Sequence, residues 1–112
     1  MRYMMLVTAD ESVELGEEAG NAVTEAAMKW VAEMDGRGVR VQGNRLRPTG
    51  DATTVRVRDG EVRLVDGPFA ETAEQVAGYD IIECADLDEA IEVASKHPVA
   101  RYGAIEVRPF WD

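Results

Sequence analysis

The sequence predicts an α+β fold in which two helices cover one face of a largely antiparallel sheet. Two segments, near residues 16–35 and 86–97, carry apolar side chains at helical spacing. Strand-forming runs lie before, between and after them, and Asp59-Gly60 is the preferred two-residue turn of a β-hairpin. The order of elements is strand, helix, several strands including the hairpin, strand, helix and strand. This order predicts a ferredoxin-like sandwich with an added hairpin.

The first strand and the first helix differ in their periodicity. Residues 2–8 favour a strand that is apolar on both sides, with Met5 and Val7 on one side and Met4 and Leu6 on the other. The helix over residues 16–35 has an apolar stripe at steps of four, three and four, formed by Val23, Ala27, Trp30 and Met34. We expect Gly36 and Gly38 to end it, and a short strand to follow near residues 39–42 or 45–47.

The hairpin can be assigned a register from its turn. Counting outward from Asp59-Gly60 gives these pairs: Arg58 with Glu61, Val57 with Val62, Arg56 with Arg63, and Val55 with Leu64. The apolar pairs share one face and the charged pairs share the other. Arg56 opposite Arg63 is a like-charge pair, which is mildly destabilising unless acids lie nearby.

The second half of the chain predicts a strand over residues 79–84 and a helix that ends at about His97, before Pro98. Asp86 is the expected N-cap, with Glu89 able to reach back in a capping box. The expected buried stripe of this helix is Leu87, Ala90, Ile91 and Ala94. A last strand is predicted over residues 104–108.

The face of the sheet away from the helices is expected to need a cover. The strands at residues 4–7 and 81–82 are apolar on both sides, which is costly for a sheet that is wetted on one face. A second copy packed sheet to sheet would shield them. The sequence therefore predicts a homodimer in the form of a dimeric α+β barrel.

Composition excludes several classes of function. A net charge of −10 makes nucleic acid and anionic lipid surfaces poor partners. Cys84 is the sole cysteine, so no intramolecular disulfide can form, and we expect it to be a small buried hydrophobe. The apolar start is too short for a signal peptide and no run could span a membrane. We expect one cytoplasmic domain over residues 1–112.

The corner after the hairpin carries a resemblance to a known family. Asp66-Gly67-Pro68-Phe69, followed by Ala70-Glu71-Thr72, Gly78-Tyr79 and Glu106-Val107-Arg108-Pro109, resembles the YCII-related, DGPF-domain family. The resemblance implies a dimeric α+β barrel with a cleft near the DGPF corner. Most members have no demonstrated activity, and some are encoded beside, or fused to, extracytoplasmic-function sigma factors. Some relatives use a His-Asp pair with the histidine in the first helical region, whereas the sole histidine here is His97.

Two residues are candidates for proton transfer. Asp66 is a candidate general base or ligand acceptor at a strand end, and the alternative is that its side chain caps the following turn. His97 is a candidate acid or base near neutral pH, and the alternative is a protonated residue that complements the end of the second helix. Gly67 and Pro68 are expected to redirect the chain, and Phe69 to plug the core under the corner.

Tyr79 and Arg108 are the candidate ligand-binding residues. The Tyr79 phenol at a strand start can donate to a ligand, and the alternative is a ring that simply straddles core and solvent. The Arg108 guanidinium can bind a carboxylate, although Arg108 and Glu106 can equally form ion pairs across the sheet or the dimer interface. No motif for a cofactor or a metal is present. The leading hypothesis is a cofactor-free dimeric barrel that binds, or acts on, a small molecule with Asp66 as acid and base. The alternative is a non-catalytic regulatory module that acts with a sigma factor.

Overall fold

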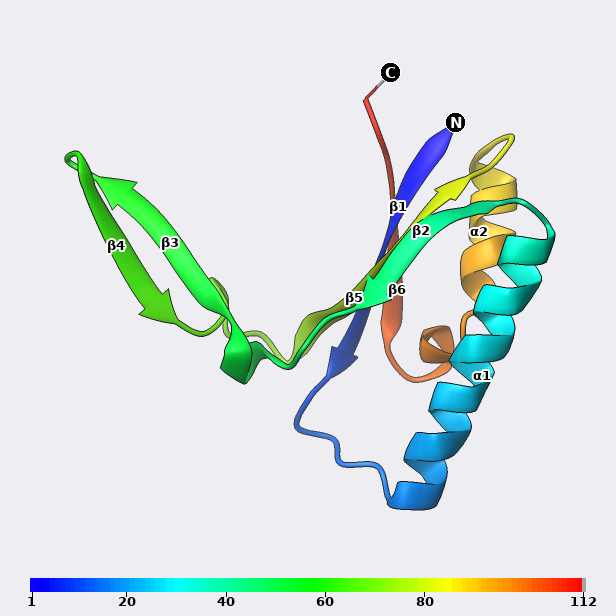
Figure 1. The fold of residues 1–112 in the computed structure, drawn as a ribbon, viewed down its shortest axis with the longest axis horizontal. Coiled ribbons are helices and arrows are strands. Elements are labelled where there is room, and N and C mark those ends of the chain that lie inside the picture. Colours follow the sequence, from blue (N-terminus) through cyan, green and yellow to red (C-terminus); the bar gives the residue numbers. More distant parts are fainter. Residues whose placement is uncertain (112) are drawn as a thin grey trace.

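The computed structural model describes residues 1–111 as an antiparallel sheet with both helices on one face and a projecting hairpin (Figure 1). The sheet has the order β2-β5-β1-β6. Its strands are β1 (Arg2–Asp10), β2 (Arg40–Arg45), β5 (Glu74–Glu83) and β6 (Ala104–Pro109), and its helices are α1 (Glu17–Gly36) and α2 (Leu87–Ser95). The hairpin is β3 (Thr53–Arg58) and β4 (Glu61–Asp66), and short 3-10 turns, η1 (Thr49–Asp51) and η2 (Pro98–Arg101), complete the chain. The predicted ferredoxin-like α+β class is confirmed.

The core lies between the sheet and the two helices. One side of β1 supplies Tyr3 and Met5, and α1 supplies Trp30 and Met34. Trp30 also ties the helices together, because its indole Nε1 donates a hydrogen bond of 3.0 Å to the carbonyl of Val93 in α2. The other side of β1 faces away from the helices and stays only half-buried. In the described chain, no helix is long and apolar enough to cross a membrane.

The hairpin register is confirmed at every predicted pair. Asp59 and Gly60 have φ values of 53° and 76°, as the expected turn requires. The hairpin projects from the sheet as an arm, which we define as residues 53–66 (Figure 1). Arg56 and Arg63 face each other in this arm, and none of the ion pairs found in residues 1–111 involves either of them.

Three expectations need correction. In α2, Leu87 and Ile91 are about half exposed. The side of the helix that packs toward Trp30 and the sheet is instead the one that carries Ala90, Val93 and Ala94. The strand expected at residues 79–84 begins at Glu74, because its pairing with β1 continues past a bulge. Phe69 is 79% exposed, so it does not plug the core under the corner as expected.

Candidate functional site

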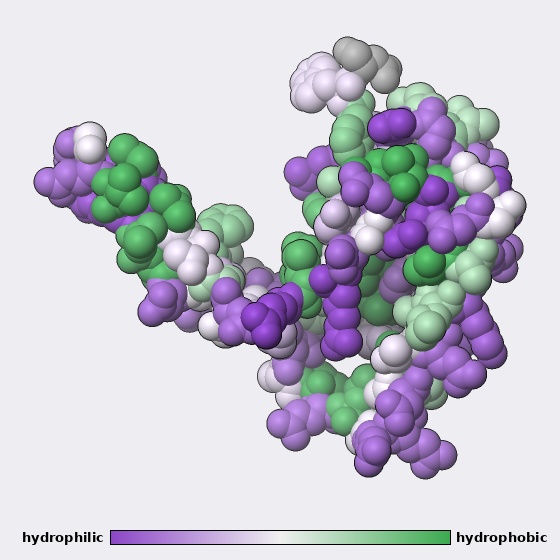
Figure 2. All heavy atoms as spheres, in the orientation of Figure 1, coloured by the Kyte–Doolittle hydropathy of each residue, from purple (hydrophilic) through white to green (hydrophobic). Residues whose placement is uncertain are grey.

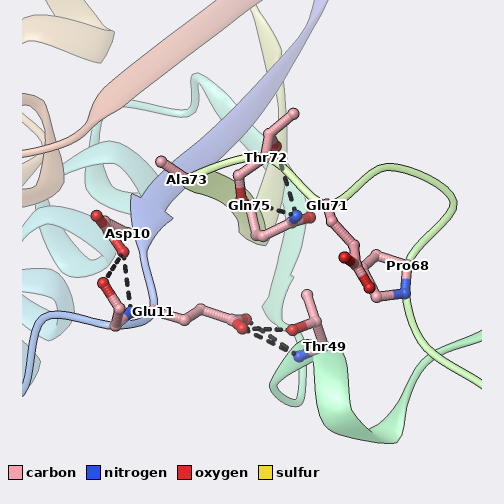
Figure 3. A pocket seen from close by; sticks show the side chains of 9 residues that line it. Asp10, Glu11, Thr49, Pro68, Glu71, Thr72, Ala73 and Gln75 are labelled. Atoms are coloured by element: carbon pink, nitrogen blue, oxygen red, sulfur yellow. Dashed lines mark hydrogen bonds between the residues drawn. The ribbon is translucent and has the colours of Figure 1, made fainter.

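An open pocket of about 340 Å³ lies beside the DGPF corner, where the end of β1, the turn η1 and the loop before β5 meet (Figure 3). Seven of its nine lining residues have polar or acidic side chains. The lining residues are Asp10, Glu11, Ser12, Thr49, Pro68, Glu71, Thr72, Ala73 and Gln75. The cleft that the family resemblance implied near this corner therefore has a counterpart in the structure.

Two of the carboxylates are fixed by short hydrogen bonds. Asp10 accepts from the backbone N–H of Ser12 at 2.9 Å and from its hydroxyl at 2.6 Å, and these bonds lower the pKa of the Asp10 carboxyl. Glu11 accepts from the backbone N–H of Thr49 at 3.1 Å and from its hydroxyl at 2.5 Å. The Glu11 contact ties the end of β1 to η1, which closes one side of the pocket.

The opposite wall is held by Gln75. Its side-chain amide donates to the carbonyls of Ala70 at 2.8 Å and Thr72 at 3.2 Å, which shapes the loop before β5. Figure 3 shows Gln75 beside Thr72 in this wall. Glu71 projects from this loop, and no hydrogen bond or ion pair within residues 1–111 engages its carboxylate. The pocket lining thus contains three carboxylates and no Lys or Arg, so it favours positive charge.

The DGPF corner is built by the backbone. Gly67 has a φ of 110°, a conformation that favours glycine. Its N–H donates to the carbonyl of Ala52 at 2.7 Å, and the Thr54 hydroxyl donates to the carbonyl of Gly67 at 2.8 Å. The Asp66 side chain makes none of the turn's described hydrogen bonds, so it does not cap the corner. It is exposed and lies two residues before Pro68, which lines the pocket.

His97 is buried between α2 and η2. Helix α2 lies on the other side of the molecule from β4 (Figure 1). The His97 ring makes an edge contact with Trp30 at 4.9 Å between centroids, and its Nδ1 accepts from the backbone N–H of Val99 at 3.1 Å. Burial lowers the pKa of His97 below its ordinary value. A neutral imidazole that caps η2 replaces the protonated helix-end residue expected from the sequence. The structure does not bring His97 and Asp66 together.

Tyr79 and Arg108 share the face of the sheet that the helices leave open. Tyr79 pairs with Leu6 on one side of β1, and Arg108 pairs with Met4 on the other. Two strand spacings separate them, so their backbones are at least roughly 10 Å apart. Arg108 forms an ion pair with Glu106 of its own strand. Neither candidate lines the pocket.

The pocket residues Asp10, Glu11, Thr49, Glu71 and Gln75 are ones that the sequence analysis missed. They come from three segments that meet only because β1 pairs with β5 and Glu11 contacts η1. Glu71 belongs to the Ala70-Glu71-Thr72 run beside the DGPF motif, and that position was the one available signal. Within residues 1–111, no group of three or more His, Cys, Asp or Glu side chains is arranged to hold a metal ion.

Two comparisons with known proteins place the chain. It is 49% identical over 67 residues to an uncharacterized protein, R00369, of Rhizobium meliloti (strain 1021). That alignment covers 58% of this chain and 54% of the relative, so the match spans about half of the relative's length. The profile of the YCII-related domain matches residues 1–112, the whole chain. With a match over its full length, the chain belongs to the YCII-related domain family.

Proposed function

We propose that this protein is a homodimer that binds a small, positively charged molecule in the pocket beside the DGPF corner, without a cofactor. The observation that carries the proposal is the pocket's wall, in which Asp10, Glu11 and Glu71 meet no basic side chain. A volume of about 340 Å³ lies within the range of small-ligand sites. An amine-bearing ligand would gain electrostatic stabilisation there that an anion would lose.

The three carboxylates have different parts in this proposal. Asp10 and Glu11 already accept hydrogen bonds from Ser12 and Thr49, so they hold the wall and supply a fixed negative field. Glu71 has no such partner among the described residues, and it is the carboxylate free to pair with an ammonium group. Hydroxyls at Ser12, Thr49 and Thr72 can bind polar atoms of the ligand.

We assign acid and base chemistry, where the bound molecule is transformed, to Asp66. Asp66 does not itself line the pocket, but its carboxylate is exposed and is two residues from Pro68 in the pocket wall, and in this proposal it acts on the ligand from the arm side. Tyr79 and Arg108 stay predictions as orienting groups. They lie on the open face of the sheet, which is the face that the proposed second copy covers.

The proposed dimer rests on that open face. Met4 and Leu6 of β1 and Ile81 of β5 lie on it, and no helix covers them (Figure 1). Charged and polar side chains flank this apolar strip, with Glu106 and Arg108 on β6. An apolar centre with a polar rim is typical of a protein interface.

Thermal-shift measurements with matched panels of small amines and small carboxylic acids test the binding proposal. We expect an amine to raise the unfolding temperature of the wild type and of Glu61→Gln, a control in the arm, but not of Glu71→Gln. Asp66→Asn is expected to retain binding and lose turnover of the molecule identified. Stabilisation by acids alone, or by no member of either panel, would refute the proposal and favour a regulatory module that acts with a sigma factor.

A further inference from the structure

The arm presents an apolar face that nothing in its own chain covers. Val55, Val57, Val62 and Leu64 point to the same side of the hairpin, and each is between 57% and 66% exposed. Figure 2 shows this hydrophobic surface along the arm, which an open gap separates from the rest of the molecule. An isolated two-stranded hairpin is marginally stable in water. The arm therefore lacks the packing that would normally hold such a hairpin.

We propose that the apolar face of the arm packs against a second copy of this chain, so that each subunit clasps the other. The inference rests on the homodimer proposed above. Because both helices lie on the far side of the sheet, the open face and the arm border the same gap (Figure 1). A copy that covers Met4 and Leu6 on the open face enters this gap and meets the arm.

The exposed area is appropriate for such an interface. The four side chains expose on the order of 400 Å², about half of the roughly 800 Å² that one partner buries in a standard interface. The open face of the sheet would supply the remainder. In a two-fold dimer both contributions occur twice, so the arm and the sheet together reach the size of a stable interface.

Charge favours a second copy as the occupant. The chain has a net charge of −10, but residues 53–66 contain three arginines and three acids and are neutral as a group. The arm is thus a part of the molecule that can approach an acidic copy without net repulsion. Arg56 and Arg63 form no ion pair in the described structure, and a partner rich in carboxylates would relieve their mutual repulsion.

A second copy packed on the arm would also lie close to the DGPF corner. Asp66 pairs with Thr53 at the root of the arm and points to the same side as the four apolar residues. A second copy packed on that face would therefore lie beside the Asp66 carboxylate. The partner would add a wall next to the pocket, which is open in the single chain.

A matched pair of substitutions on one strand tests the clasp. Val62→Asp adds a charge to the apolar face, and Val65→Asp makes the same change on the opposite face of β4. Sedimentation velocity over a concentration series gives the dimer dissociation constant of each variant. We expect Val62→Asp to weaken the dimer roughly 30-fold or more, as loss of a central apolar contact does, and Val65→Asp to change it far less. Circular dichroism checks that both variants fold.

Hydrogen exchange provides a second readout that needs no substitution. Amides of residues 53–58 and 61–66 should be protected at concentrations where the wild type is a dimer and should exchange faster on dilution. A wild type that is monomeric at all concentrations overturns both the dimer and the clasp. A wild-type dimer that Val62→Asp does not weaken, or whose arm amides exchange rapidly, overturns the clasp and leaves the dimer intact.

Discussion

Replacing Arg40 with methionine should expose how strongly this fold depends on one partly buried ion pair. Asp80 is 7% exposed on the helix-covered side of β5, and its Oδ1 lies 2.9 Å from Nε of Arg40, whose side chain is 16% exposed. Arg40→Met keeps the apolar stem and removes the cation, leaving a buried carboxylate without its partner. Breaking such buried pairs costs about 3–5 kcal/mol, and the partial exposure of Arg40 places the expected loss at about 3 kcal/mol. In a domain of this size that corresponds to roughly 10–20 °C in Tm.

Arg37→Met is the matched control. Arg37 pairs with Glu92 at 2.7 Å, but both side chains are partly open to solvent, which screens the pair, so the same substitution should cost much less than Arg40→Met. Urea unfolding of both variants and of the wild type measures the two losses directly. Equal losses, or a loss below about 1 kcal/mol for Arg40→Met, would refute the reasoning that burial makes this pair important.

The same ion pair predicts how the stability of Arg40→Met changes with pH. Burial raises the pKa of Asp80 above its ordinary value of 3.8, and Arg40 opposes that increase. Without Arg40 the pKa rises further, so between 3.8 and the new value the folded variant binds more protons than the unfolded chain. Its stability relative to the wild type should therefore improve as the pH falls from 7 toward 4. A deficit that is the same at both ends of this range would contradict the assignment to Asp80.

Three further predictions concern packing and buried groups. Gly43→Ala should destabilise the protein by about 2 kcal/mol or more in urea unfolding, because the new Cβ would collide with the Asp80 carboxylate. Gly20 in α1 has open space around it, so Gly20→Ala is the control and should be neutral or stabilise by up to about 1 kcal/mol. Burial raises the pKa of Cys84 to about 11, so a thiol reagent at pH 8 should label it only as fast as the protein unfolds locally. Rapid labelling of the native state would contradict its burial. Burial lowers the pKa of His97 below 6.5, so its imidazole NMR signals should titrate with a midpoint below 6.5. The stability that depends on the neutral ring should be lost as the pH falls below 6.5. A midpoint at or above 6.5 would show that the ring is not buried.

Local rules were sufficient for much of the architecture. The Asp59-Gly60 turn determined the entire hairpin register, because a two-residue turn allows only one pairing of the flanking residues. The Asp86 side chain accepts the expected capping bond from the N–H of Glu89 at 2.9 Å, although Glu89 reaches back to the N–H of Ala85 rather than that of Asp86. Local rules failed where packing direction mattered. Leu87 and Ile91 fit a helical stripe, but the side of α2 that packs against Trp30 is the one that carries Val93.

What the sequence by itself determined was the order of elements, the hairpin and the family motif, because each depends on neighbours within a few residues. Only the tertiary structure decided the site. Asp10, Glu11, Thr49 and Glu71 come together because strands distant in sequence pair and a side chain of one segment binds the backbone of another. The tertiary structure also separated Asp66 from His97, since the arm projects away from the core that encloses the imidazole (Figure 1). Contacts between remote segments carry no periodic signal, so they became visible only once the chain was folded.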